Sequence, residues 1–323
     1  MTTTISKLEN KICTEKYEIT KDEALMLYES SATEELCKAA NRIRQACCSG
    51  KSTICSIINA KQGGCSENCR YCAQSVHWKT PCSVQNMITP EKAAQLSLRA
   101  LENNVTRIAL VTAGRGLQGK DFETSLSCYK EILKDSSNKM AVCASFGIIQ
   151  SRQLEQLKAA GVSRYHHNLE TGKNFYKNIC TTHTYEERIN TIKAAKKAGL
   201  EICCGGIIGM GESKEDRLDL ALAIRKLDVQ SVPINILTPI PGTPLENTKP
   251  ISKDEILRTI AIFRFIMPSQ TIRCAAGRKK LGNNGEDAFL SGANALISGD
   301  FLTTPGSTNK EDIEMLQNLG YTI

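Results

Sequence analysis

Short apolar runs of strand length alternate along the chain with longer stretches of helical periodicity. Such alternation favours parallel strands joined by crossover helices. The predicted strands are Thr53–Ile58, Arg107–Ala113, Met140–Phe146, Arg164–Leu169, Glu201–Ile208, Ser231–Leu237, Thr271–Ala275 and Ala295–Ser298. Eight strand–helix units close a (β/α)8 barrel of the TIM type, so we predict an α/β barrel. An open doubly wound sheet is the competing fold, but its glycine-rich dinucleotide loop is missing after the first strand.

Helix start and stop signals fall between these runs. Thr89-Pro90-Glu91 begins one helix, and Gly161 and Gly199 end two others. Before the first strand, Thr20 precedes acidic residues in a helical first turn, and a last helix is expected over Lys310–Leu319. We therefore divide the chain into an N-terminal helical extension (1–50), the barrel (51–305) and a C-terminal helix (306–323).

Composition narrows the class of protein. With 323 residues, of which 41% are hydrophobic, the chain can bury one large core. It begins with a polar stretch and has no apolar run of membrane-spanning length, so we expect a soluble, cytoplasmic protein without a membrane partner. Fifteen cysteines, spread along the chain and odd in number, favour reduced metal-binding thiols over a disulfide framework. The net charge is +7, but no aromatic residues alternate with the basic ones, so the sequence does not predict nucleic-acid binding.

Three cysteines with C-x3-C-x2-C spacing follow the first predicted strand: Cys65, Cys69 and Cys72. Barrel enzymes place their sites at the carboxyl ends of the strands, which is where this loop lies. Four-iron clusters normally take four thiolates, so three would leave one iron open to a small molecule. A zinc site with a fourth ligand from elsewhere, and three thiols without metal, are the alternatives.

A second set of cysteines lies on the predicted strands. Cys55, Cys143, Cys203 and Cys274 fall on the first, third, fifth and seventh. Alternate strands of a barrel share interior layers, so these thiols are expected to form a second metal site. Cys204 neighbours Cys203 and must face the opposite way on a regular strand, so at most one of the two should bind metal.

The C-x3-C-x2-C motif, with Tyr71 before its last cysteine, resembles the signature of the radical S-adenosylmethionine (SAM) superfamily. The resemblance implies a [4Fe–4S] cluster on Cys65, Cys69 and Cys72, with Tyr71 at the cofactor. SAM would chelate the fourth iron and be cleaved to a 5′-deoxyadenosyl radical. Four residues after the fifth strand also fit the superfamily's G-x-I-x-G-x-x-E stretch at the adenine: Gly205, Ile207, Gly209 and Glu212. A tight strand-to-helix turn explains these glycines equally well.

From Cys55 to Pro305 the chain resembles the biotin synthase family. The matching segments are the cysteine loop to Ser75, His167–Thr171, Thr181–Arg188, Gly205–Glu212, Ser231–Asn235, Arg273 with Ala276–Arg278, and Leu302–Pro305. The resemblance implies sulfur insertion between C6 and C9 of dethiobiotin, using two SAM molecules and sulfur from an auxiliary iron–sulfur cluster. It also implies a flavodoxin-like electron donor and a homodimer.

The same resemblance assigns roles to individual residues. Asn168 and Glu170 match residues at the SAM ribose and substrate, and Arg188 matches one at the SAM carboxylate. Ile207 matches a residue at the adenine. Substrate contacts are implied for Asn235, at the ureido ring, and for Thr303 and Thr304.

The departures from the family concern the auxiliary cluster. Typical members hold a [2Fe–2S] cluster with three cysteines and an arginine. Cys143, Cys203 and Arg273 match this set, but Ala109 stands where the remaining cysteine would be. In exchange the chain has Cys55, Cys204 and Cys274. We hypothesise a rebuilt, larger cluster, of a four-iron type with an additional sulfide.

Two other functions stay open at this point. Another radical SAM barrel enzyme, such as a hydrogenase-cofactor maturase or a methylornithine-type mutase, would form 5′-deoxyadenosine without biotin. A non-enzymatic iron–sulfur or zinc sensor would not cleave SAM at all.

Overall fold

The computed structural model describes residues 4–30, 32–299 and 306–323. Its centre is a parallel sheet with the strand order β5-β4-β3-β2-β1-β9-β8-β7-β6, in which β5 also pairs with β7. The strands are β1 (Thr53–Lys61), β2 (Arg107–Thr112), β3 (Ala141–Ser145), β4 (Arg164–His166), β5 (Glu201–Cys203), β6 (Gly206–Ile208), β7 (Ser231–Ile236), β8 (Thr271–Cys274) and β9 (Ala295–Ile297). Because β5 and β6 are two pieces of the fifth predicted strand, the sheet is a closed barrel of eight strand positions. The predicted (β/α)8 fold is confirmed.

The break in the fifth strand comes from close backbone packing. A Cβ atom at Gly205 would lie 1.8 Å from the carbonyl oxygen of Pro233, and one at Gly206 would lie 2.3 Å from that of Glu170. Cys204 N donates to Ser231 O (2.9 Å), so the chain stays attached to β7 across the break. The two glycines therefore let β7 and the segment after β4 approach the fifth strand position from both sides.

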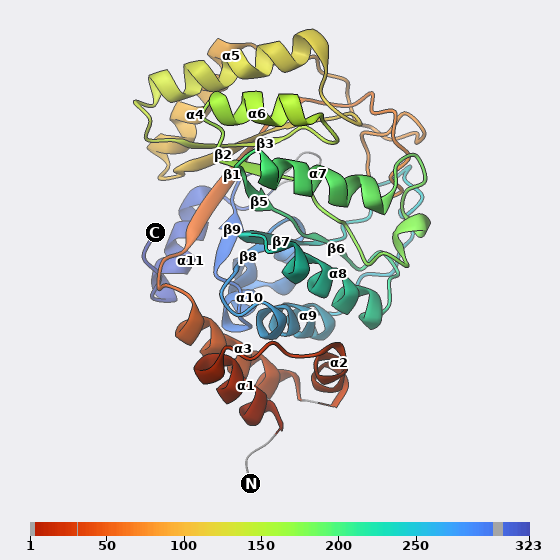
Figure 1. Cartoon of the computed structure of the whole chain (residues 1–323), viewed down its shortest axis with the longest axis vertical. Helices are drawn as coiled ribbons and strands as arrows, with labels where there is room; N and C mark the ends of the chain where they lie inside the picture. The colour runs from red at the N-terminus through yellow and green to blue at the C-terminus, as the bar shows by residue number, and fades with distance from the viewer. Residues whose placement is uncertain (1–3, 31, 300–305) are drawn as a thin grey trace.

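The crossover helices surround the barrel (Figure 1). They are α4 (Pro90–Glu102), α5 (Gly119–Asp135), α6 (Ser151–Ala159), α7 (Tyr185–Lys197), α8 (Lys214–Leu227), α9 (Lys253–Ile266) and the short α10 (Glu286–Leu290), with 3-10 turns at Tyr176–Asn178, Arg278–Leu281 and Asn283–Gly285. The sequence signals mark their ends correctly. The Thr89 side chain caps α4 by accepting from Lys92 N, and Gly161 and Gly199, with φ of 89° and 78°, follow the ends of α6 and α7.

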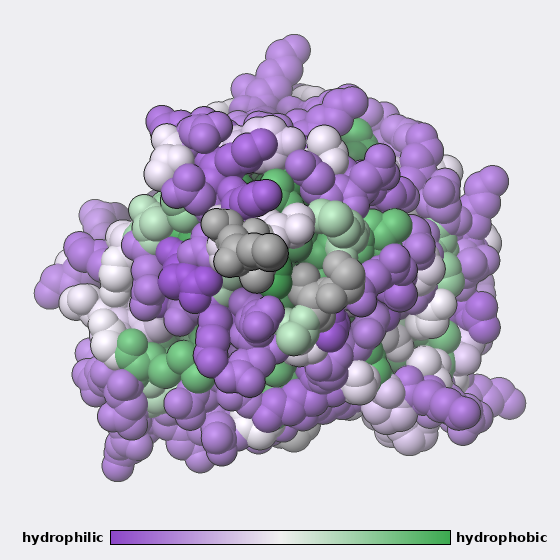
Figure 2. Space-filling model, turned by 90° about the horizontal axis from the view of Figure 1, so that it is seen from below, coloured by the Kyte–Doolittle hydropathy of each residue, from purple (hydrophilic) through white to green (hydrophobic). Residues whose placement is uncertain are grey.

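Three helices precede the barrel: α1 (Thr4–Glu15), α2 (Lys21–Ser30) and α3 (Thr33–Cys47). They pack on the outer side of the barrel, with α3 against α9 and α2 against α8 and α9 (Figure 1). Arg217 of α8 joins the layers, because its guanidinium donates to Tyr28 Oη (2.9 Å) and to Glu255 Oε1 (2.6 Å). Seen from below, the surface is mostly hydrophilic, with hydrophobic residues in small separate groups (Figure 2).

The last helix, α11 (Asn309–Asn318), is tied to the loop that follows β8. Its Asp312 forms a buried ion pair with Arg278, at 2.5 Å. Ser52 N donates to Thr322 O (2.8 Å), so the end of the described chain also runs beside the start of β1.

Candidate active site

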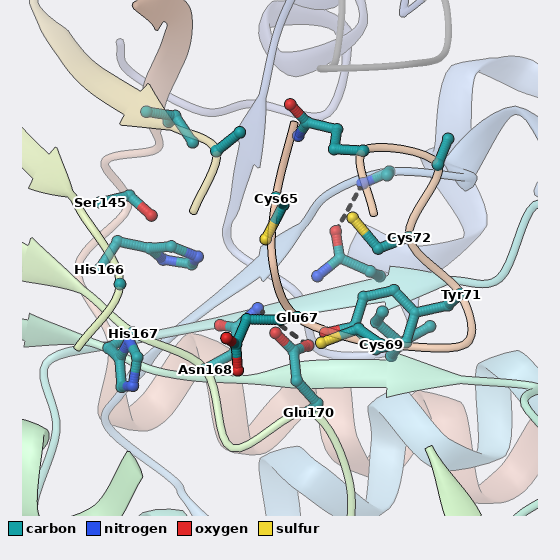
Figure 3. A pocket seen from close by; sticks show the side chains of 18 of the residues that line it. Cys65, Glu67, Cys69, Tyr71, Cys72, Ser145, His166, His167, Asn168 and Glu170 are labelled. Carbon is teal, nitrogen blue, oxygen red and sulfur yellow. Dashed lines mark hydrogen bonds between the residues drawn. The ribbon is translucent and has the colours of Figure 1, made fainter. Parts of the chain in front are cut away.

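The three cysteines of the C-x3-C-x2-C motif lie on the loop that leaves the carboxyl end of β1. Backbone hydrogen bonds fix this loop: Cys65 N donates to Gln74 O (2.9 Å), and Arg70 N donates to Ile179 O (2.9 Å). All three cysteines line a cavity of about 360 Å³ at the mouth of the barrel. Figure 3 shows the Cys65 and Cys72 sulfurs at this cavity, with Tyr71 beside Cys69. The loop therefore brings together the three thiols that the spacing predicted.

The environment of these thiols suits a metal cluster. Burial raises the pKa of Cys65 and raises that of Cys72 to about 11. A hydrogen bond with Cys180, followed by burial, raises the pKa of Cys69. Protonated thiols are poor ligands, whereas a bound cation deprotonates them outright. Three thiols that line one cavity, two of them buried and that of Cys72 half-buried, thus fit an iron–sulfur cluster, which Cys65, Cys69 and Cys72 would hold.

Asn168 and Glu170 face the cysteine loop across the cavity, on the segment that follows β4 (Figure 3). Asn168 Oδ1 accepts from Gly205 N (3.0 Å), and its amide nitrogen donates to Glu170 Oε2 (3.3 Å). The backbone of Glu170 has φ 70° and is held by Ile207 N, which donates to its carbonyl oxygen (2.8 Å). A carboxylate and an amide fixed side by side can bind vicinal hydroxyl groups.

Arg188 reaches the same cavity from α7 and is itself buried. It donates through Nε to Tyr176 Oη (2.7 Å), through one terminal nitrogen to Asn168 O (2.9 Å), and through the other to His183 Nε2 (2.8 Å). Glu170 Oε1 lies 3.6 Å from one of these terminal nitrogens, as an ion pair without a hydrogen bond. A guanidinium has five N–H donors, so two are still without a hydrogen bond. Arg188 is thus a rigid cation that can still clamp a carboxylate.

The glycine-rich segment Gly205–Glu212, which includes β6, has two different functions in the fold. Ile207 lines the cavity, as expected of an adenine contact. Glu212 instead turns toward its own loop, where its carboxylate accepts from Gly209 N, Met210 N and Arg217 Nε, each at 2.7 Å. Gly205 and Gly209 serve the backbone, through close packing and a φ of 90° respectively. The structure therefore places Ile207 at the cavity and the other three residues behind it.

Asn235, on β7, also lines the cavity. Its amide nitrogen donates to Gly206 O (3.1 Å), and its oxygen accepts from Ala276 N (3.2 Å). The amide nitrogen and the amide oxygen of Asn235 each keep one further hydrogen-bonding position for a ligand. Thr303 and Thr304 lie outside the described residues.

Beneath the cavity, three cysteines project from separate strands into the barrel. Cys143 accepts a hydrogen bond from Arg107 (3.4 Å), Cys203 donates one to Ser231 Oγ (3.5 Å), and Cys55 is close enough to raise the pKa of Cys143. Arg164, between them, interacts with all three thiols. We call Cys55, Cys143 and Cys203 the inner thiols.

The other two candidate thiols face outward. Cys204 is fully buried and affects the pKa of Tyr185 on α7, outside the barrel, so only Cys203 of this pair points inward. Cys274 follows Arg273, which points inward, and its charged neighbours include Asp312 of α11. The structure contradicts the expected place of Cys274 in the inner layer, because successive residues of a strand face opposite sides.

Arginines surround the inner thiols. Burial opposes ionisation of Cys203, but His166, Arg273 and Arg164 outweigh it and lower the pKa of this thiol to about 6. Arg273 is held in place by the carbonyl oxygens of Thr53 (2.8 Å) and Leu296 (2.7 Å). With Arg107 this makes three guanidinium groups around three thiols, which suits a buried anionic cluster.

Sequence reasoning missed a buried chain of polar groups beside Cys69. His183 Nδ1 lies 2.6 Å from Glu67 Oε2, and Cys180 Sγ lies 3.3 Å from His183 Nδ1. Both Glu67 and His183 belong to motifs that carried the family resemblance, the cysteine loop and the Thr181–Arg188 run. No spacing rule connects them, because the contact joins the loop after β1 to the segment before α7.

Comparisons with known proteins agree with this geometry. Residues 60–224, half of the chain, match the radical SAM superfamily model, and residues 233–322 match the model described as the biotin and thiamin synthesis associated domain. Methylornithine synthase superposes with a TM-score of 0.81 at 18% identity over 98% of this chain and 96% of its own. A maturase of the [FeFe]-hydrogenase superposes with 0.84 at 16% identity, over 99% and 75%. These two likenesses show the fold. The barrel with its cysteine loop is that of a radical SAM enzyme.

Sequence relatives narrow the class. The biotin synthase of Clostridium tetani is 49% identical over 322 residues, covering 99% of this chain and 98% of the relative. That of Fusobacterium nucleatum is 48% identical over 326 residues, covering 99% and 90%. The chain belongs to the biotin synthase family, radical SAM enzymes that insert sulfur. The family implies a [4Fe–4S] cluster and SAM. In the described part of the chain, no helix has the length and apolar character needed to span a bilayer.

Proposed function

We propose that this protein converts dethiobiotin to biotin in the cavity between the cysteine loop and the inner thiols. The carrying observation is the position of His166. It lines the cavity whose mouth holds Cys65, Cys69 and Cys72, and it pairs across the β4–β5 register with Cys203 of the inner layer. A molecule in the cavity would therefore lie between two thiol sites, as a sulfur insertion requires.

When bound, the two clusters and SAM would supply a hydrogen-abstracting radical on one side and sulfur on the other. The chain's own residues would position the reactants. Arg188 would clamp the SAM carboxylate with its two remaining donors, and Asn168 with Glu170 would bind the ribose hydroxyls. Tyr71 and Ile207 would pack on the nucleoside, while Asn235 would bind the ureido ring.

Apolar side chains would keep water away from the reacting carbons. Ile57, Val111 and Ile297 line the cavity from three neighbouring strands. They face the inside of the barrel between the cysteine loop and the inner thiols. Excluding water in this way prevents quenching of a reactive intermediate.

For the auxiliary cluster we propose a four-iron type with an additional sulfide, held by Cys55, Cys143 and Cys203. The argument comes from strand register. Ala109, where the family has cysteine, pairs with Ile57, so the gained Cys55 lies two residues closer to the amino end of the barrel on the adjoining strand. Two residues of strand correspond to roughly 6–7 Å. Ligands spread further along the barrel axis favour a larger cluster, and Arg273 would balance its charge rather than bind iron.

One anaerobic assay tests the reaction. Purified protein receives dethiobiotin, SAM and a chemical reductant, and the products are read by mass spectrometry. We expect biotin together with 5′-deoxyadenosine. Formation of 5′-deoxyadenosine without biotin would identify a different radical SAM reaction, and absence of both would favour a sensor.

The cluster type has its own test. Anaerobically purified protein is analysed for iron and sulfide and by Mössbauer spectroscopy. We expect more iron and sulfide than one [4Fe–4S] and one [2Fe–2S] cluster contain. A match to that content would reject the larger cluster while leaving the reaction intact. The family also leads us to expect a flavodoxin-like electron donor and a homodimer. Activity with reduced flavodoxin tests the donor, and the molecular mass in solution tests the dimer.

A further inference from the structure

One of the cluster cysteines, Cys69, also belongs to a compact group of possible metal ligands whose other two members have no role in the proposed reaction. Cys69 Sγ, Cys180 Sγ and a ring nitrogen of His183 all lie within 4.8 Å of one another, the only such group of three found among the described residues. All three residues are buried. Cys69 and His183 line the active-site cavity, so an ion could enter from there.

Hydrogen bonds fix the tautomer of His183. Arg188 can only donate, so His183 Nε2, 2.8 Å from its guanidinium, must accept. The ring proton is then on Nδ1 and is donated to Glu67 Oε2 at 2.6 Å. A histidine that keeps a lone pair on one nitrogen and donates the other N–H to a carboxylate has the usual arrangement of a metal ligand. Nε2 lies 3.8 Å from Cys180 Sγ, slightly further than Nδ1 at 3.3 Å, but only Nε2 keeps its lone pair.

The charges around this group suit one divalent ion. Two thiolates, the Glu67 carboxylate and the Glu170 carboxylate that pairs with Arg188 carry a formal charge of −4. Arg188 and Arg115, which lies 3.3 Å from Glu67 Oε2, carry +2. A divalent cation would bring the total to zero, which matters because buried charges must be paired. Arg188 would give up His183 Nε2 and would keep its bonds to Tyr176 Oη and Asn168 O.

We propose that the cluster-free protein binds a single divalent ion of the zinc class through Cys69, Cys180 and His183, with a fourth position open to water. Two sulfurs and one imidazole nitrogen are a ligand set that zinc prefers. Cys69 cannot bind this ion and the [4Fe–4S] cluster at the same time; the competition between them rests on the proposed function, in which Cys69 is a cluster ligand. Zinc bound first would therefore block cluster assembly, and it binds such sites more tightly than ferrous iron.

The experiment uses the full chain, stripped of iron under anaerobic conditions, and Co²⁺ as the probe. Less than one equivalent of Co²⁺ is added against a chelator, and thiolate-to-cobalt absorption reports the ligands. We expect tight binding in the wild type, in Cys65→Ser and in the control Cys204→Ser. Cys180→Ser and His183→Gln should bind more than ~100-fold more weakly, because loss of an outer partner alone costs 10–100-fold. Glu67→Gln removes the carboxylate that accepts from His183 Nδ1, and it should weaken Co²⁺ binding by about 10–100-fold.

Cluster assembly supplies the second readout. Cys180→Ser should still assemble the [4Fe–4S] cluster from iron and sulfide, which also shows that it folds, and prior zinc should block assembly only in the wild type. Equal Co²⁺ affinity in Cys180→Ser and wild type would overturn the proposal. Loss of binding in Cys65→Ser with retention in Cys180→Ser would likewise place the ion on the loop thiols. Neither result depends on whether biotin is formed.

Discussion

The cysteine loop at the barrel mouth and the inner thiols hold the same chemical groups in different ways. Cys65, Cys69 and Cys72 lie on one short loop whose backbone hydrogen bonds fix them, so their spacing along the chain already describes the site. Cys55, Cys143 and Cys203 come from three separate strands. Their convergence depends on strand order and on which face each residue occupies. A local motif can be recognised by spacing, whereas a dispersed site needs the orientation of every strand.

The largest expected effect separates the two sites completely. Cys69→Ser should abolish SAM cleavage and biotin formation, because the cluster at the mouth would lose a thiolate. The inner thiols are untouched, so iron and sulfide bound by the auxiliary site should remain. Metal analysis and 5′-deoxyadenosine release measure both. Nucleoside release at the wild-type rate would contradict the assignment of the loop.

Neighbouring cysteines on the fifth strand give the sharpest test of the inner layer. Cys203→Ala should remove auxiliary iron and biotin formation while leaving 5′-deoxyadenosine formation in place. Cys204→Ala is the matched control, since its thiol packs outside the barrel. It should cost about 1 kcal/mol of stability, as small buried deletions do, and keep biotin formation. If both variants lost auxiliary iron, or neither did, the side of the strand that each cysteine faces would not decide which one binds the cluster.

Substitution of Glu212 tests whether the stability of the fold depends on the loop that follows β6. The buried Glu212 carboxylate accepts two backbone N–H groups and pairs with Arg217. Glu212→Ala leaves that guanidinium without a carboxylate partner at one nitrogen and should destabilise the fold by about 3–5 kcal/mol. Glu215→Ala, on the exposed first turn of α8, should stay within about 0.5 kcal/mol. Denaturant unfolding of the two variants measures the difference, and equal midpoints would argue against a bracing role.

The smallest effect concerns the substrate side of the cavity. Asn235→Ala removes one amide and should raise the KM for dethiobiotin about tenfold, the equivalent of one neutral hydrogen bond. SAM binding, for which we propose Arg188, Asn168 and Glu170 as the polar contacts, should be unchanged. Steady-state kinetics with each substrate varied in turn would show this. A change confined to the KM for SAM would contradict the assignment of Asn235 to dethiobiotin.

The sequence predicted the barrel well because strands and helix ends carry local signals. Thr89 and Gly199 mark helix ends in the structure as they do in the sequence. It failed for Cys274, since a single residue of register decides whether a side chain enters the barrel, and Arg273 takes the inward position. It also missed the contact of Glu67 with His183, which joins loops that only the closed barrel brings together.

The ion pair of Asp312 with Arg278 has a practical consequence for handling the protein. Arg278 lies two residues after Ala276, whose backbone N–H fixes the amide of Asn235. The terminal helix is thus coupled, through one turn of chain, to the wall expected to bind the ureido ring. An affinity tag or a truncation that disturbs α11 would alter substrate recognition, so purification handles belong at the other end of the polypeptide.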